Sequence, residues 1–178
     1  DNKLIFSVVT NPYVGKAVMT EGFDFNTKLK TLETATNKIE HFKKSAAMPA
    51  ASMDTVNIED EESDYEIKLW LDPTDKTAYY YTETEKVYLN TNSSEMFYSK
   101  YNEQKIKNIL ELDLSNFDTS KVTSMSLMFC LDNKYISKDK LETIYVKNDF
   151  NTARLIDTYA LFGNRKKLRG GNGSYLTN

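Results

Sequence analysis

Apolar positions in the first part of the chain follow strand-like and then helix-like spacing. The run Lys3 to Val9 is short and apolar, which predicts a buried strand. From Phe25 onward, apolar residues recur every three, four or seven positions, which predicts a helix with Asp24 as its N-cap. Poor helix formers from Thr34 onward favour a short helix, so Lys38 to Lys43 is expected to form a strand.

An acidic run and a hairpin come next. Residues 59–66 carry six acidic side chains and no basic one, which is typical of a solvated loop. A calcium site is the alternative, but the run lacks the Asp/Asn alternation and central glycine of an EF-hand-type loop. Tyr65 to Leu71 and Lys76 to Thr82 predict two antiparallel strands. Their tyrosines and Trp70 indicate a sheet face with phenol groups at its edge or, alternatively, an aromatic platform for sugars.

The second half of the chain contains an internal repeat. Three short strands are predicted at 87–89, 112–114 and 144–146, and an apolar pair follows each of them. The pairs recur after 32 and then 33 residues: Met96-Phe97, Met128-Phe129 and Leu161-Phe162. A unit of one strand and one helical turn cannot cover its own apolar face. We therefore expect the units to stack, with the three pairs in one buried spine.

The middle copy of the repeat is the most complete one. Met125, Met128 and Phe129 have the spacing of a short helix, and Cys130 beside them is expected to be a buried apolar residue. Seven side chains of this copy are expected to point inward: Leu112, Leu114, Phe117, Val122, Met125, Met128 and Phe129.

The remaining side chains of the three strands should form two columns on an open face, because alternate side chains of a strand point to opposite sides. We expect the columns to contain the candidate binding residues Tyr88, Asp113 and Tyr145, and Lys86, Glu111 and Thr143. Rigid aromatic side chains contribute contact area at low entropic cost, which suits contact with a peptide or glycan. Three repeats nevertheless expose little area compared with a standard protein interface.

The stretch from Leu112 to Phe129, LDLSNFDTSKVTSMSLMF, resembles the leucine-rich repeat of bacterial surface proteins, the BspA-like family. Val87 to Phe97 is similar to the opening unit of that family, and Leu141 to Val146 together with Gly170 to Gly173 is similar to its closing unit. The resemblance covers residues 86–173. It implies a secreted or cell-surface protein, with adhesion to host proteins or other cells as the role of some members, and it brings no catalytic residues.

Composition narrows the classes of function. The 178 residues include 23 basic and 26 acidic side chains, which does not fit a nucleic-acid-binding protein. One cysteine and one histidine, His41, exclude a cysteine-based zinc site and most acid–base constellations, so we expect no metal, no cofactor and no catalytic residue. No stretch approaches the ~20 apolar residues of a membrane-spanning helix. No intact signal peptide is visible at Asp1, and we expect it to have been removed.

These observations predict an α+β fold in two parts. An N-terminal α+β capping region, residues 1–83, should precede a short leucine-rich-repeat-like solenoid of parallel strands and short helical turns, residues 84–178. The expected function is a non-catalytic interaction or adhesion module of a bacterium, with host or cell-surface proteins or glycans as partners. The alternatives are a hydrolase-type enzyme that uses His41 or surface carboxylates, and a purely structural spacer of the cell envelope.

Overall fold

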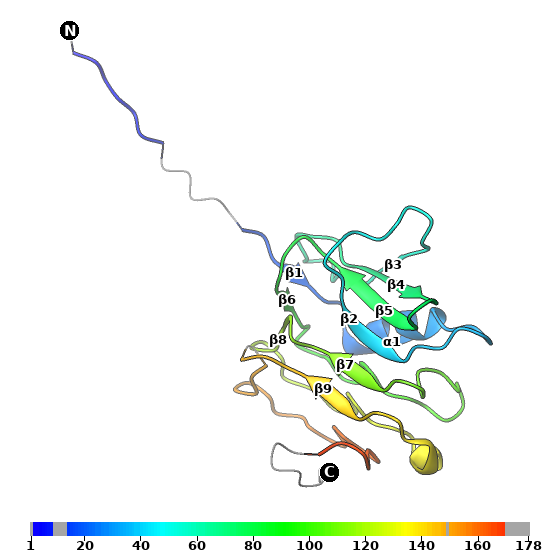
Figure 1. Cartoon of the computed structure of the whole chain (residues 1–178). Coiled ribbons are helices and arrows are strands. Elements are labelled where there is room, and N and C mark those ends of the chain that lie inside the picture. The colour runs from blue at the N-terminus through cyan, green and yellow to red at the C-terminus, as the bar shows by residue number, and fades with distance from the viewer. Residues whose placement is uncertain (1, 9–13, 149, 170–178) are drawn as a thin grey trace.

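The computed structural model describes residues 2–8, 14–148 and 150–169 (Figure 1). The described part contains one α-helix, one short 3-10 helix and nine strands. In chain order they are β1 (Ala17–Val18), α1 (Gly22–Thr31), β2 (His41–Lys44), β3 (Val56–Asn57), β4 (Lys68–Asp72), β5 (Thr77–Tyr81), β6 (Val87–Tyr88), β7 (Glu111–Asp113), β8 (Phe117–Asp118), η1 (Asn133–Lys138) and β9 (Thr143–Tyr145).

The strands form two sheets. β1, β6 and β8 make a three-stranded parallel sheet. The larger sheet has the order β3-β4-β5-β2-β7-β9, in which β5, β2, β7 and β9 are parallel and β3, β4 and β5 are antiparallel. The protein is therefore a mixed α/β fold with few helices, which confirms the expected fold class in this coarser form. The expected boundary after residue 83 falls between β5 and β6, and residues on both sides of it contribute strands to each sheet.

Helix α1 begins at Gly22, two residues before the predicted N-cap. Glu21 occupies the N-cap position, and the carboxylate of Asp24 instead accepts a hydrogen bond from the Thr20 hydroxyl and pairs with Lys28. The helix ends at Thr31, close to the expected end. Its inner face is buried because the apolar side chains on that face pack into the core, as their spacing predicted. The strand expected near residues 38–43 is β2.

The predicted hairpin is confirmed as β4 and β5, which are joined by the turn at 73–76. The side chains of Trp70 and Tyr80 are buried, and Tyr79 and Tyr81 are only partly exposed. These aromatic side chains therefore belong to the packing of the sheet rather than to an exposed platform for sugars. The acidic side chains of the run 59–66 do not gather into a metal site: among the described residues, no three His, Cys, Asp or Glu side chains are grouped so that they could hold a metal ion.

Three stretches of chain lie in register on one another: residues 17–44, 87–113 and 117–145, which we call layers 1, 2 and 3. Residues 150–169 follow as layer 4. The N–H of Phe97 donates to the carbonyl of Met128 in the next layer (2.8 Å), and the N–H of Phe129 donates to the carbonyl of Leu161 (2.9 Å). Such bonds between layers satisfy the backbone groups of segments that are neither helix nor strand.

The apolar pairs line up across the layers, as the repeat predicted. The rings of Phe97 and Phe129 are stacked with their centroids 5.9 Å apart, and those of Phe129 and Phe162 are stacked at 5.4 Å. Phe25 of α1 contacts the other end of this row, edge-on to Phe97 at 5.3 Å. The seven inward-pointing side chains predicted for the middle copy, from Leu112 to Phe129, are all buried.

The short helix expected at Met125 to Phe129 is wrong. The chain there forms hydrogen-bonded turns, and Leu127 has a left-handed backbone with φ of 59°. The N–H of Leu127 donates to the carbonyl of Tyr159 in layer 4, so it cannot take part in a helix. Glu95 in layer 2 and Ala160 in layer 4 occupy the equivalent positions, with φ of 66° and 47°. The same corner is thus repeated in layers 2, 3 and 4.

The predicted register of the first repeat strand is also wrong. Val87 does not lie beside Leu112; it pairs with Phe117, in the smaller sheet. The strand beside Leu112 is β2, through Phe42. The unit that precedes layer 2 therefore lies in the N-terminal region, and residues 45–86, including the hairpin, separate it from the rest of the repeat. This insertion breaks the sequence period at the point where the first copy was expected to begin.

The N-terminal segment does not form the buried strand expected at 3–9. Residues 3–8 have no strand structure, and Val9 lies outside the described residues. The side chains of Leu4, Ile5, Phe6 and Val8 are 77%, 86%, 80% and 82% exposed. Figure 1 shows this segment running outside the body of the protein. The expected closing turn, Gly170 to Gly173, also lies outside the described residues. None of the described helices has the length and apolar character required to cross a membrane.

Candidate binding face on the six-stranded sheet

The outer face of the six-stranded sheet carries polar side chains in two columns. Phe42 and Leu112 point into the core, so their neighbours along β2 and β7 point outward. The pairing of the strands places the outward residues in register. The first column consists of His41, Glu111 and Thr143, and the second of Lys43, Asp113 and Tyr145.

Four of the six predicted binding residues lie on this face, namely Glu111, Asp113, Thr143 and Tyr145. The other two do not, because β6 belongs to the smaller sheet, where Tyr88 pairs with Asp118 rather than with Asp113; Lys86 precedes this strand. The expected columns are therefore wrong in their first residues, Tyr88 and Lys86, which do not lie on this face.

Two residues of β2, His41 and Lys43, take their places; the sequence pattern named His41 only as a possible catalytic residue and did not place either residue on this face. A signal was available: the tripeptide of β2, His41-Phe42-Lys43, has the same polar–apolar–polar pattern as Glu111-Leu112-Asp113 and Thr143-Ile144-Tyr145.

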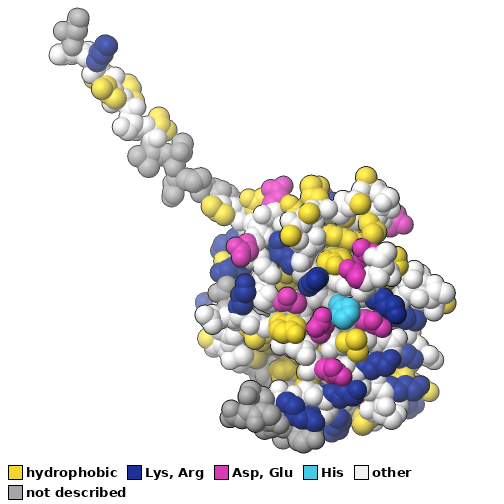
Figure 2. All heavy atoms as spheres, in the orientation of Figure 1, with side chains coloured by type: hydrophobic (Ala, Val, Ile, Leu, Met, Phe, Trp, Pro, Cys, Tyr) yellow, Lys and Arg dark blue, Asp and Glu magenta, His cyan; other side chains and the backbone are white. Residues whose placement is uncertain are grey.

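A shallow hollow of about 400 Å³ lies at the centre of the face. The Nδ1 atom of His41 is 2.9 Å from the Oε1 atom of Glu111, within hydrogen-bond distance. Figure 2 shows acidic and basic side chains around the histidine on this side of the molecule. The hollow is lined by His41, Phe42, Lys43, Asp75, Thr77, Glu111, Asp113 and Tyr145. Three of these residues are acidic and one is a lysine, so the lining attracts hydrogen-bond donors and cations.

Aromatic side chains continue the face across β5 and β4. The ammonium of Lys43 lies 5.7 Å from the centroid of the Tyr79 ring, which stacks on the indole of Trp70 at 5.8 Å. The Tyr79 hydroxyl donates to Asp75, and this hydrogen bond, together with burial, raises the pKa of the phenol. These contacts fix the orientation of Tyr79 beside Lys43 and Asp75, two residues that line the hollow.

Tyr88 and Lys86 belong to a separate, basic cluster on the smaller sheet. The ammonium groups of Lys16, Lys86 and Lys121 lie 5.0, 5.8 and 5.3 Å from the centroid of the Tyr88 ring. Lys86 also pairs with Asp118 at 3.3 Å. Burial raises the pKa of Asp118, but hydrogen bonds from Ser120 and the pairing with Lys86 outweigh this effect and hold the pKa below its ordinary value.

The described residues offer little else for chemistry. They contain no group of three or more His, Cys, Asp or Glu side chains that could hold a metal ion. Cys130 is buried as expected, and burial raises the pKa of its thiol, which disfavours the reactive thiolate.

A comparison of the chain with known protein families, with curated proteins and with solved structures finds no match to any of them. The candidate face is therefore defined by its geometry alone. It presents charged, hydrogen-bonding and aromatic side chains from parallel strands, around a hollow of about 400 Å³.

Proposed function

We propose that the stacked layers form a short leucine-rich-repeat-like solenoid of the BspA-like bacterial surface type. Support for this proposal comes from the register of the layers and from the row of stacked rings, Phe97, Phe129 and Phe162. It also comes from the left-handed corner that recurs at Glu95, Leu127 and Ala160. A repeat that places its corner and its buried ring at matching positions in successive copies is typical of solenoid proteins.

We propose further that the protein is a non-catalytic interaction or adhesion module, secreted or on the surface of a bacterium. The observation that carries this proposal is the outer face of β2, β7 and β9, where half-buried and exposed polar side chains stand in register on parallel strands. Tyr145 is 51% exposed at the edge of the hollow. An exposed tyrosine held by a sheet is a frequent anchor in protein interfaces. The partner is a host or cell-surface protein, or a glycan, with basic or hydrogen-bond-donor groups that complement Asp75, Glu111 and Asp113.

Binding of the immobilised protein to panels of matrix proteins, mucins and glycans tests this proposal. We expect binding at micromolar concentrations to at least one class, and we expect Tyr145→Ala to weaken it about tenfold, as for an interface anchor worth somewhat more than 1 kcal/mol. Tyr159→Ala is the matched control, because Tyr159 is also exposed but lies in layer 4, outside the hollow. Absence of binding to every panel, or equal losses in the two variants, would contradict the proposal and favour a structural spacer.

The geometry also favours one alternative, a hydrolase-type activity. The imidazole of His41 and the carboxylate of Glu111 are within hydrogen-bond distance, and Asp113 lies in the same hollow. A carboxylate that orients an imidazole is a recurrent part of acid–base sites. Turnover of a panel of ester, glycoside and peptide substrates that is lost in His41→Ala would establish this alternative over the interaction module.

A further inference from the structure

Strand β9 is the last strand in the order of the six-stranded sheet. It pairs with β7 on one side, and no strand of the described residues pairs with its other side. An edge strand presents backbone N–H and carbonyl groups that can pair with another extended segment. β9 thus has the backbone geometry required to accept one more strand, and its neighbours β7, β2 and β5 suggest a parallel one.

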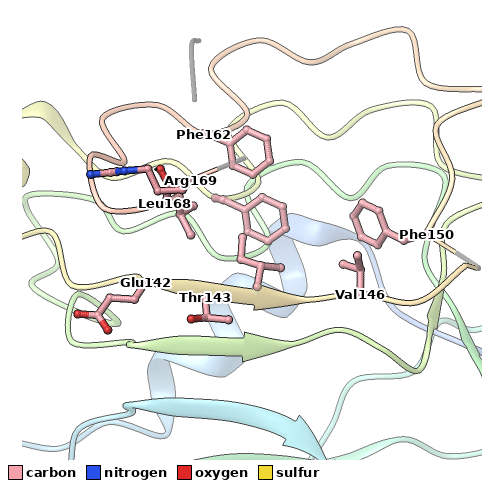
Figure 3. A pocket seen from close by; sticks show the side chains of 9 residues that line it. Glu142, Thr143, Val146, Phe150, Phe162, Leu168 and Arg169 are labelled. Carbon is pink, nitrogen blue, oxygen red and sulfur yellow. The ribbon is translucent and has the colours of Figure 1, made fainter. Parts of the chain in front are cut away.

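An apolar groove of about 330 Å³ lies along this open edge. Figure 3 shows Val146, Phe150 and Phe162 bordering the same space, on the side of β9 that is turned away from β7. The groove is where the stacked row of rings ends, because Phe162 contacts Phe129 on one side and lines the groove on the other. Val146 and the partly buried Ile144 complete the apolar surface beside the strand. The edge therefore offers both backbone pairing and an apolar surface for alternate side chains.

The N-terminal segment has the complementary properties. Residues 3–8 are rich in aliphatic and aromatic side chains, and these side chains are exposed. In a strand, Leu4, Phe6 and Val8 would share one face, while Lys3, Ile5 and Ser7 would lie on the other. So many exposed apolar side chains in one short segment are unusual for a soluble surface and mark an interaction site. We call residues 3–8 the arm.

We propose that the arm of one molecule adds as a parallel strand to the open edge of β9 in a second copy of this chain. Leu4, Phe6 and Val8 then enter the apolar groove. With Leu4 beside Ile144, Phe6 lies beside Val146. In this register Lys3 lies beside Thr143.

The occupant is a second copy because the arm and the groove are attached to different ends of the stack, and Figure 1 shows the arm running away from its own body on the side of β1, far from β9. The arm precedes β1 in layer 1, whereas β9 and Phe162 belong to layers 3 and 4. The two contact surfaces differ, so the association is head-to-tail and yields a ring or an open chain of molecules rather than an isologous dimer. The buried strand that the sequence pattern predicts at this position is then formed between molecules.

Sedimentation of the whole chain from micromolar concentrations to about 1 mM tests the proposal, since even weak association is half populated at the upper end. We expect the average mass to rise with concentration. Phe6→Asp should raise the concentration at which association is half complete by at least ~10-fold. Ser7→Asp adds the same charge on the opposite face of the arm and should raise this concentration less than ~3-fold. Both residues lie in the arm, outside the packed layers, so neither change should alter the melting temperature. A monomer at every concentration, or equal shifts in both variants, would overturn the proposal.

A cysteine pair distinguishes the second copy from the arm's own chain. We expect Phe6→Cys and Val146→Cys, carried by two different molecules, to form a mixed disulfide faster than either variant forms one with itself. Neighbouring strands lie about 4.8 Å apart, which suits a disulfide. Burial of Cys130 limits interference from the native thiol. If the double variant instead closes a disulfide within one chain at high dilution and the mixed pair does not form, the arm binds its own molecule and the proposal is wrong.

Discussion

Replacing Phe129 by alanine tests whether the layers stabilise one another. The ring of Phe129 is 1% exposed and lies between the rings of Phe97 and Phe162. Removing a buried phenylalanine side chain costs about 3–5 kcal/mol, and each aromatic pair contributes about 0.5–1.5 kcal/mol beyond area burial. With each aromatic pair at the lower end of its range, we expect a loss of roughly 4–6 kcal/mol in the free energy of unfolding, which is a large part of the ~5–15 kcal/mol available to a typical domain.

Urea unfolding followed by the fluorescence of Trp70, the single and buried tryptophan, measures this loss. Phe162→Ala is the matched control. It removes the same ring from the end of the row, where the side chain is partly exposed and stacks on one described ring. We expect its cost to be about half that of Phe129→Ala, roughly 2–3 kcal/mol. Equal costs for the two variants, or a cost below ~2 kcal/mol for Phe129→Ala, would refute the view that the middle ring joins the layers.

Two further predictions concern close packing and burial. Gly22→Ala should lower the free energy of unfolding by about 1–3 kcal/mol in the same urea titration. A Cβ at this position would lie 2.1 Å from the carbonyl oxygen of Ser94, so layer 2 must shift to accommodate it. The control is Thr27→Ala, on the exposed side of the same helix, which should change the free energy of unfolding by no more than about 0.5 kcal/mol. Cys130 should react with iodoacetamide much more slowly at pH 8 than the exposed thiol of a Ser52→Cys variant. The reason is that burial raises the pKa of the Cys130 thiol, so the reactive thiolate forms only at higher pH. Equal rates of the two thiols in the folded protein would contradict this prediction.

The sequence predicted those parts of the fold in which neighbouring segments share a short-range pattern. The β4–β5 hairpin follows from alternating apolar residues and an intervening turn, and the row of aromatic rings follows from pairs that recur at nearly constant spacing. The register of the first unit could not be predicted in the same way, because residues 45–86 separate β2 from the rest of the repeat. The short helix at 125–129 was wrong for a different reason: the backbone there bonds to the next layer, which local spacing does not reveal.

The candidate face was predicted where its residues come from layers 2 and 3. Asp113 and Tyr145 lie on it because the alternation along β7 and β9 determines which side chains face outward. His41 and Lys43 were not placed on this face because β2 was not assigned to the repeat. The acid–imidazole contact between His41 and Glu111 joins residues 70 positions apart, and only the pairing of β2 with β7 brings them together.

The central position of β2 has a consequence for synthesis on the ribosome. One neighbour, β5, ends at Tyr81, and the other begins only at Glu111. A nascent chain that has emerged as far as the hairpin can cover one side of β2 but leaves the other side bare. An uncovered strand edge invites pairing with other chains. The protein should therefore be most prone to aggregate in the interval after Tyr81 has emerged from the ribosome and before Glu111 has emerged.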